Sequence, residues 1–299
     1  MDINTEWAFE QYERVRAALP TATFSDTPHR IENLLDIADQ FDVFLLDAFG
    51  VLNVGGDPVP GAPETVAALQ AAGKHVVVLT NGAGAPTRMS VEKYRKLGYD
   101  FTRENVISSR DAMVAGLAER SEENWGVMAA AFSELDTFPK TCRQLQDDDE
   151  VYEWADGFAL LSILEWDEDR QARLLRALKK RPRPVIVGNP DIIAPQGEQF
   201  SLEPGWYAHE IARATGIKPA FYGKPFGNVF DIALSRVDPT IPNDRIVMVG
   251  DTLHTDVLGG RAAGVKTVLI TDHGLFKGRD VDGFIDTSGI IPNYIARTT

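Results

Sequence analysis

Polar side chains that could act on an anionic group follow several apolar stretches of this 299-residue chain. Asp47 comes directly after one apolar run, Thr80 and Asn81 end a second run, and Asp251 ends a third. Lys224 stands at the start of a predicted helix. A carboxylate at the end of a buried strand is costly unless it is paired or has chemistry to do. We therefore interpret Asp47 as a nucleophile.

These residue types form a coherent set for phosphoryl transfer. Carboxylates such as Asp47, Asp251 and Asp256 hold a divalent cation through oxygen, whereas a lysine and a hydroxyl group bind phosphate oxygens. A bound cation offsets the repulsion between an attacking carboxylate and an anionic phosphoryl group, so that in-line attack becomes feasible. The set predicts metal-assisted chemistry on a phosphorylated substrate.

The segments that must position these side chains read as strands that alternate with helices. Each predicted strand ends in polar residues and glycine, which is typical of an open parallel sheet whose ligands bind at the carboxyl edge. The predicted fold is therefore α/β, with a doubly wound, Rossmann-like parallel sheet. The strand patterns are 41–46, 75–80, 106–108, 246–250 and 265–270, and the helical patterns are 63–72, 86–97, 224–237 and 255–263.

The pattern changes between residues 110 and 202, where separate strand and helix signals predict an inserted α/β module with its own sheet. We expect a core domain made of residues 1–109 and 203–299, with a cap domain inserted at 110–202. A helix at 206–215 is expected to resume the core pattern. Residues 1–30 are predicted to be a largely helical N-terminal extension of the core, with a loop at 21–30, and residues 31–40 are predicted to form a short helix.

Composition excludes several classes of function. The net charge of −14 argues against nucleic acid as a partner, because affinity for its phosphates comes from lysine and arginine. Cys142 is the only cysteine, which excludes a disulfide within the chain and fits a reducing compartment. The acidic N-terminus does not resemble a signal peptide, and no stretch approaches the roughly 20 apolar residues of a membrane helix. We expect a soluble, cytoplasmic protein without a membrane partner.

Four segments of the chain resemble, in order, the four motifs of the haloacid dehalogenase (HAD) superfamily. The chain looks most like subclass IIA, the branch with a large C2-type cap between the second and third motifs, which includes the 4-nitrophenyl phosphatase and N-acetylglucosamine-operon phosphatase types. The resemblance covers roughly residues 40 to 272. The motifs are Asp-Ala-Phe-Gly-Val-Leu at 47–52, Thr-Asn-Gly at 80–82, Gly-Lys-Pro at 223–225 and Gly-Asp-Thr-Leu-His-Thr-Asp at 250–256, with a cap motif Gly-Asn-Pro-Asp at 188–191.

The resemblance implies a role for each matching residue. Asp47 would attack phosphorus and form an aspartyl-phosphate, while Thr80 and Lys224 would bind the phosphoryl oxygens. Substrate-binding candidates are the two residues after Thr80 and the polar pair of the cap motif, namely Asn81, Gly82, Asn189 and Asp191.

The same resemblance implies a Mg²⁺ site. The ion would be held by Asp47, the backbone carbonyl of Phe49 and Asp251, with Asp256 as a ligand or a support for the other ligands.

Phe49 departs from the family pattern. Phosphatases of the family normally carry a second aspartate two residues after the nucleophile, which protonates the leaving alcohol and activates the hydrolytic water. General acid–base catalysis is typically worth about 10² to 10⁴ in rate, or roughly 3 to 5 kcal/mol of activation free energy. The metal contact survives, because any residue supplies a backbone carbonyl, but the acid is lost. His254 is a candidate replacement, although it also reads as an ordinary loop histidine.

Two functions from different classes remain open. The first is a Mg²⁺-dependent phosphohydrolase that acts on a small phosphorylated metabolite, for which a sugar phosphate is one option. The alternative is a catalytically weak or silent protein that binds a phosphorylated ligand, which the phenylalanine at position 49 motivates. A carbon–phosphorus or carbon–halogen cleaving enzyme is less favoured, because Asp47 and Thr80 are too close in sequence to admit the cap that such enzymes insert there.

The exposed face of the cap often mediates dimers in similar enzymes, so a homodimer is also open.

Overall fold

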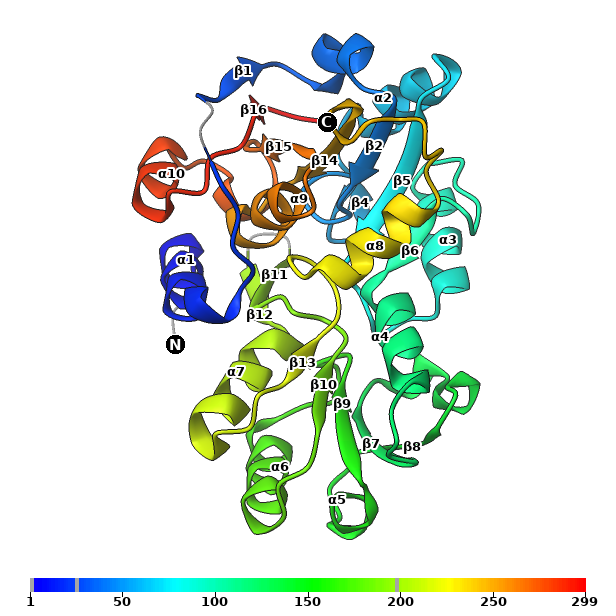
Figure 1. Ribbon diagram of the computed structural model, residues 1–299, viewed down its shortest axis with the longest axis vertical. Coiled ribbons are helices and arrows are strands. Elements are labelled where there is room, and N and C mark those ends of the chain that lie inside the picture. Colours follow the sequence, from blue (N-terminus) through cyan, green and yellow to red (C-terminus); the bar gives the residue numbers. More distant parts are fainter. Residues whose placement is uncertain (1–2, 25–26, 197–198) are drawn as a thin grey trace.

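The computed structural model of the protein describes residues 3–24, 27–196 and 199–299. It contains two α/β units that lie at opposite ends of the long axis of the molecule (Figure 1). The chain begins in the larger unit, passes through the smaller one and returns to the larger unit, where it ends. The predicted α/β core with an inserted cap is confirmed.

The larger sheet has seven parallel strands within the described residues, in the order β1-β16-β15-β14-β2-β5-β6. Its central strands are apolar runs buried on both faces, as expected for a parallel sheet covered by helices. Leu46 of β2 pairs with Val249 of β14 and with Val78 of β5, so the residues that follow these strands emerge at one edge. The strands are β1 (His29–Ile31), β2 (Val43–Leu46), β5 (His75–Thr80), β6 (Val106–Ser108), β14 (Ile246–Gly250), β15 (Lys266–Ile270) and β16 (Tyr294–Ala296).

Different helices cover the two faces of this sheet, because successive side chains of a strand point to opposite faces. Phe44 of β2 belongs to the apolar cluster that includes α2 (Ala62–Ala71) and α3 (Thr87–Lys96). Leu45, its neighbour, belongs to the cluster that includes α8 (Gly227–Ser235). The sheet is therefore doubly wound, and its core lies on both sides of β2.

The N-terminal extension packs against the C-terminal part of the core. Phe9 and Tyr12 of α1 (Thr5–Arg14) share an apolar cluster with α10 (Asp282–Ser288) and with the segment that leads into α9 (Leu258–Ala262). Two predictions about the region that follows need correction. Residues 29–31 form the edge strand β1 in place of the predicted loop, and the predicted short helix is a 3₁₀ helix at Leu34–Gln40.

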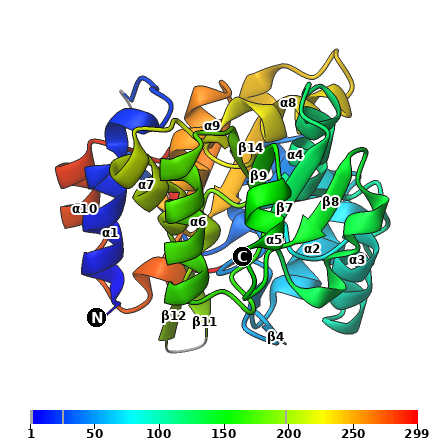
Figure 2. The same ribbon diagram turned by 90° about the horizontal axis from the view of Figure 1, so that it is seen from below.

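The cap has its own parallel sheet, with the strand order β13-β10-β9-β7-β8 in the part of the chain that the structure describes. Three helices cover one face of this sheet and α4 (Ser109–Ala118) covers the other. Figure 2 views the molecule from the cap end, where α5 and α6 lie nearest the viewer. The elements are β7 (Asn124–Met128), β8 (Thr141–Gln144), β9 (Gly157–Leu160), β10 (Val185–Val187), β13 (Ala220–Phe221), α5 (Glu150–Trp154), α6 (Glu168–Lys180) and α7 (Pro204–Thr215).

The end of the cap differs from the predicted boundary at residue 202. The strand β13 pairs with β10 of the cap sheet, and α7 packs against α6 through Ala208 and Ile211. The helix expected to resume the core at 206–215 therefore lies on the cap. Nothing in the local pattern marks this, because an amphipathic helix shows that it has an apolar face but does not show which sheet will bury it. We propose that the cap ends near residue 221.

Two short antiparallel hairpins complete the fold. The first, β3 (Asn53–Val54) with β4 (Asp57–Pro58), follows β2 where the sequence predicts a loop or small flap. The second, β11 (Ile193–Gln196) with β12 (Gln199–Leu202), joins β10 to α7. None of the helices in the described ranges is long and apolar enough to span a membrane.

Candidate active site

The predicted site residues of the core emerge at one edge of the large sheet. Asp47 is the first residue after β2, and its backbone N–H donates to the carbonyl of Val249 in β14 at 2.8 Å. Thr80 is the last residue of β5, and Asp251 is the first residue after β14. Three adjacent parallel strands therefore bring these three side chains to the same carboxyl edge.

A tight turn follows Asp47 and brings the chain close to Asp251. Gly50 has φ +73°, and a Cβ atom built there would lie 2.6 Å from Oδ2 of Asp251, which is too close for any side chain. The turn is closed by the N–H groups of Leu52 and Asn53, which donate to the carbonyl of Ala48 at 2.8 and 2.9 Å. Glycine is thus required at this position both by the backbone conformation and by the approach to the carboxylate.

Lys224 links two carboxylates in the interior of the site. Its Nζ lies 2.5 Å from Oδ1 of Asp47 and 2.6 Å from Oδ1 of Asp256, and the lysine is 1% exposed. Burial by itself lowers the pKa of Lys224, but the charges of Asp256 and Asp47 outweigh it and raise the pKa above its ordinary value. The lysine is therefore a fixed positive charge beside Asp47.

Asn81 holds Lys224 in place through its backbone. Its Oδ1 accepts from the N–H of Lys224 at 2.7 Å, and its Nδ2 donates to the carbonyl of Lys224 at 2.9 Å. The same Nδ2 donates to Oδ1 of Asp191 at 2.8 Å. Asn81, predicted to contact substrate, therefore also joins the lysine segment to the cap motif.

The carboxylates of Asp47, Asp251 and Asp256 form a compact cluster, in which one oxygen of each lies within 4.8 Å of the others. Burial raises the pKa of Asp251 to about 8, helped by the neighbouring charges of Asp256 and Asp47. Burial also raises the pKa of Asp256 to about 6, although Lys224 opposes this. An all-oxygen donor set with this surplus of negative charge fits a divalent cation such as Mg²⁺.

Two groups that the sequence did not single out orient Asp251. The hydroxyl of Thr252 donates to its Oδ1 at 2.9 Å, and the N–H of Leu275 donates to its Oδ2 at 2.9 Å. The N–H of Thr252 also donates to Oδ2 of Asp256 at 3.1 Å, where a π-helical turn at Leu253–Val257 carries Asp256 back to the site. Thr252 could have been found from its place in the fourth motif, but Leu275 lies in a short 3₁₀ helix, Gly274–Phe276, which carries no local signal of this contact.

A cavity of about 460 Å³ opens above these residues, between the core and the cap. Its core side includes Asp47 and Asp251, and its cap side includes the loop 161–164 that follows β9. Lys224 and Asp256 lie behind Asp47 and are buried. The other predicted residues that line the cavity are Phe49, Thr80, Asn81, Gly82, Asn189 and Asp191.

The cap motif forms a hydrogen-bonded chain at the cavity wall. Oδ1 of Asn189 accepts from the N–H of Asp191 at 3.0 Å, and Nδ2 of Asn189 donates to Oε2 of Glu203 at 3.0 Å. Burial raises the pKa of Asp191 well above its ordinary value and raises the pKa of Glu203 to about 7. The sequence did not reveal Glu203, because a glutamate just before a predicted helix reads as an ordinary helix start.

The side chain at position 49 carries no titratable group and lies partly in the core. The ring of Phe49 packs partly into the core cluster, and Nζ of Lys93 lies 4.9 Å from the ring centroid. Nζ of Lys93 donates to Oδ1 of Asn53, in the hairpin formed by β3 and β4, at 3.1 Å. Phe49 therefore offers the cavity an apolar wall.

His254 does not reach the cavity. Its Nε2 lies 2.5 Å from Oε1 of Glu13, and its ring stacks on Tyr12 of α1 with centroids 5.1 Å apart. Burial lowers the pKa of His254 to about 4, which keeps the ring neutral near pH 7. The π-helical turn that directs Asp256 inward directs His254 toward the N-terminal helix, so its candidacy as a substitute acid is wrong.

Two family models match separate parts of the chain. One describes a haloacid dehalogenase-like hydrolase and matches residues 44–136, and the other describes a HAD-hydrolase-like domain and matches residues 221–297. Together they include the four segments that converge at the sheet edge. The chain belongs to the haloacid dehalogenase superfamily. The gap between the two matched ranges includes most of the cap. A large cap inserted between the second and third motifs is the feature that defines subclass IIA of the superfamily.

Relatives of this HAD protein include phosphatases. An acid sugar phosphatase from Staphylococcus aureus (strain MRSA252) is 24% identical over 230 residues, which cover 77% of this chain and 86% of the relative. The crystal structure of a possible sugar phosphatase from Cytophaga hutchinsonii superposes with a TM-score of 0.79 and 26% identity, covering 90% of this chain and 98% of that one. A glycerol phosphate phosphatase from Mycobacterium tuberculosis, in complex with magnesium, has the same fold, with a TM-score of 0.69, 20% identity and coverage of 88% and 76%.

We predict that Mg²⁺ stabilises this HAD protein through the aspartate cluster. Binding to the folded state alone raises the free energy of unfolding by about 2.7 kcal/mol when the ion is at 100 times its dissociation constant. The melting temperature measured by scanning fluorimetry should therefore rise on adding Mg²⁺ to EDTA-treated protein. The rise should be lost in Asp251→Asn and kept in Asp39→Asn, which changes an exposed aspartate. An equal rise in all three proteins would place the ion elsewhere.

We also predict that Glu203 makes the fold less stable as the pH rises. The folded protein keeps the Glu203 proton up to about pH 7, whereas the unfolded chain releases it near the ordinary pKa of 4.5. The free energy of unfolding should therefore fall across this window by up to about 3 kcal/mol. In urea unfolding, Glu203→Gln should exceed the wild type in stability at pH 8 and differ little at pH 5.

The control for this experiment is Glu92→Gln, a change at an exposed glutamate on α3. It should leave the difference from wild type the same at both pH values. If Glu203→Gln also showed no change between pH 5 and pH 8, the folded protein would not hold that proton.

Proposed function

We propose that this protein is a Mg²⁺-dependent phosphohydrolase that forms an aspartyl-phosphate on Asp47. The observation that carries this proposal is the contact of one buried lysine, Lys224, with Asp256 and with Asp47, which lines the cavity between the core and the cap. We infer a small phosphorylated metabolite as the substrate, with sugar phosphates as the first class to test. The names of the S. aureus and C. hutchinsonii relatives support that choice. The single cysteine supports a reducing, cytoplasmic setting.

In the proposed reaction, a carboxylate oxygen of Asp47 attacks phosphorus and the bond from phosphorus to the leaving alcohol breaks. Lys224 holds Oδ1 of Asp47, which leaves Oδ2 without a hydrogen-bond partner among the described residues and available for attack. Thr80, at the cavity wall, binds the phosphoryl oxygens, and the Lys224 ammonium behind Asp47 offsets their negative charge. Water then hydrolyses the aspartyl-phosphate, which restores Asp47 and releases inorganic phosphate.

Asp47, Asp251, Asp256 and the backbone carbonyl of Phe49 would hold the metal ion. When bound, Mg²⁺ supplies positive charge that offsets the repulsion between the carboxylate and the phosphoryl group. The side chains of Thr252 and Asn81 keep the carboxylates and Lys224 oriented before the substrate arrives. The cap loop 161–164 closes the other side of the cavity and limits access of water.

Phe49 determines how the leaving group departs in this mechanism. The leaving oxygen gains negative charge as the bond breaks, and a phenylalanine ring cannot give it a proton. Good leaving groups such as a nitrophenolate need no acid, whereas sugar alkoxides do. We therefore propose an enzyme whose rate depends strongly on the acidity of the leaving alcohol. The second candidate function is a silent protein that binds a phosphorylated ligand. It applies if the lack of a general acid at position 49 abolishes turnover completely.

We predict that the pure protein with Mg²⁺ releases phosphate from 4-nitrophenyl phosphate and that Asp47→Asn does not. The amide is a poor nucleophile and cannot form the acyl phosphate. The expected loss is at least about 10³-fold, in line with removal of a covalent nucleophile. Brief incubation followed by an acid quench should trap phosphate on wild-type protein only, measured by mass spectrometry. Equal release by the wild type and Asp47→Asn would contradict this mechanism. Thermal stabilisation by phosphorylated ligands without turnover would favour the silent binder.

We predict that Phe49→Asp restores the general acid. Turnover of sugar phosphates should rise by about 10-fold or more, while turnover of 4-nitrophenyl phosphate should change little. Phe49→Asn is the matched control, because it has nearly the same shape as aspartate and cannot donate a carboxyl proton. Steady-state rates on both esters distinguish the cases. A wild-type rate on sugar phosphates that is already high and unchanged by Phe49→Asp would show that position 49 causes no deficit.

A further inference from the structure

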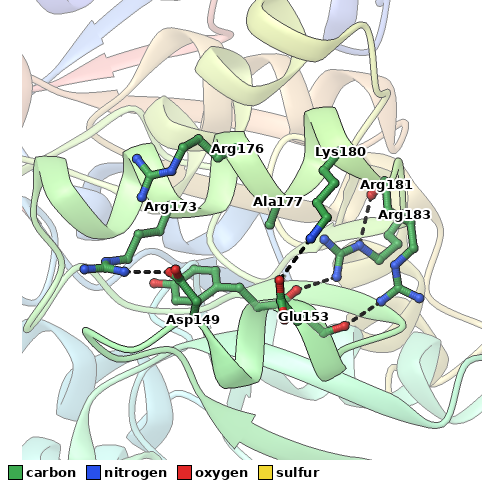
Figure 3. A pocket seen from close by; sticks show the side chains of 9 residues that line it. Asp149, Glu153, Arg173, Arg176, Ala177, Lys180, Arg181 and Arg183 are labelled. Carbon is green, nitrogen blue, oxygen red and sulfur yellow. Dashed lines mark hydrogen bonds and ion pairs between the residues drawn. The ribbon is translucent and has the colours of Figure 1, made fainter.

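A second cavity, of about 430 Å³, lies on the cap between α5 and α6 (Figure 3). It is remote from the catalytic cavity for a topological reason. The loop 161–164, which follows the carboxyl end of β9, lines the catalytic cavity. Arg181 and Arg183, which line the second cavity, precede the amino end of the adjacent parallel strand β10. The two cavities therefore lie at opposite ends of the cap sheet.

The second cavity is basic, although the chain as a whole has a net charge of −14. The carboxylates of Asp149 and Glu153 on the α5 side are already paired with α6, Asp149 with Arg173 at 2.6 Å and Glu153 with Lys180 at 3.0 Å. Figure 3 shows these pairs bridging the two helices. Among the described residues that line the cavity, the three arginines without a carboxylate partner are Arg176, Arg181 and Arg183.

Two of these arginines are fixed in position by the end of α5. Nη2 of Arg181 donates to the carbonyl of Ala155 at 2.6 Å, and Nη1 of Arg183 donates to the carbonyl of Tyr152 at 2.6 Å. These bonds satisfy carbonyls at the helix C-terminus. Neither guanidinium group forms an ion pair with a carboxylate of the described residues, and Asp156 contributes only a more distant negative charge near Arg183. Arg183 is only 7% exposed and stacks on Phe158, with 4.5 Å between Cζ and the ring centroid. Burial, with the nearby charge of Arg181, lowers the pKa of Arg183 to about 10.

Two further groups of the cavity are free to bind a ligand. Arg176 makes no hydrogen bond or ion pair with any described residue, and its guanidinium is drawn without a partner in Figure 3. The hydroxyl of Tyr152 is buried and has no hydrogen-bond partner within the described part of the chain, and this residue also lines the cavity. A buried hydroxyl without a partner is unfavourable unless a ligand or water satisfies it.

We propose that this cavity is a binding site for a diphosphate group, separate from the catalytic site. Three guanidinium groups without carboxylate partners match the charge of a diphosphate, which is close to −3 near neutral pH, and guanidinium groups bind phosphate oxygens through paired N–H donors. The Tyr152 hydroxyl supplies one more hydrogen bond to a phosphate oxygen. The diphosphate is either free inorganic pyrophosphate or the diphosphate of a nucleotide such as ADP.

The test is calorimetric titration of the full-length protein with inorganic pyrophosphate in the presence of EDTA. The wild type should bind, and Arg176→Ala should weaken binding by about tenfold, because it removes one charged phosphate contact. Tyr152→Phe should weaken binding by about threefold or more. Since the hydroxyl has no hydrogen-bond partner among the residues that the structure describes, this variant should keep or exceed the wild-type melting temperature.

Lys179→Ala is the matched control, since Lys179 is an exposed cation on α6 that does not line the cavity. It should leave the affinity unchanged. A parallel titration with ADP identifies the source of the diphosphate. Tighter binding of ADP that is equally sensitive to Arg176→Ala would indicate a nucleotide, and tighter binding of pyrophosphate would indicate the free ion.

Three results would overturn the proposal. The first is no detectable binding of either compound. The second is binding that Arg176→Ala and Tyr152→Phe leave unchanged, which would place the anion in the catalytic cavity. The third is an equal loss in Lys179→Ala, which would indicate attraction to the general charge of α6. None of these results depends on whether the protein hydrolyses a phosphoester.

Discussion

The contact of Lys224 with Asp47 and Asp256 is the interaction on which the rest of the site depends. Two carboxylates lie within 2.6 Å of one buried ammonium, and Asp251 completes a cluster with more negative than positive charge. In an interior of low dielectric constant such a cluster is stable only if its geometry is fixed and its charge is balanced. The glycine turn at Gly50 and the hydrogen bonds to Asp251 provide the first condition, and a divalent cation would provide the second.

The core and the cap are joined through the same amide that holds the lysine. Asn81 accepts from the backbone of Lys224 and donates to Asp191 of the cap motif. A change in the position of the cap would therefore reach the lysine both through the Asn81 side chain and through the backbone that leads from β13 to Lys224. The cap sheet also has two functional ends in our proposals. Its carboxyl end faces the catalytic cavity, and its amino end lies beside the basic cavity between α5 and α6.

The resemblance to the motifs of the superfamily predicts an aspartate at the position that Phe49 occupies in this chain. The ring of Phe49 packs against the apolar core, and the ammonium of Lys93 lies over the ring. Substitution of one residue can remove the acid without disturbing the metal-binding backbone, because the main-chain carbonyl does not depend on the side chain. In the proposed mechanism the nucleophile and the phosphate-binding groups are thus preserved, while departure of the leaving group depends on the acidity of the leaving alcohol.

The sequence by itself determined the parallel α/β core, the inserted cap and the convergence of Asp47, Thr80 and Asp251 at one edge. It could do so because strand period, glycine turns and motif order are local signals, and parallel strands place their carboxyl ends together. Only the tertiary structure decided that α7 and β13 belong to the cap, that His254 faces the N-terminal helix, and that Leu275 and Glu203 support the site. The first outcome depends on which of several apolar surfaces a helix or strand packs against. The others depend on the direction in which a turn points each side chain. A local pattern of apolar and polar residues does not specify either of these.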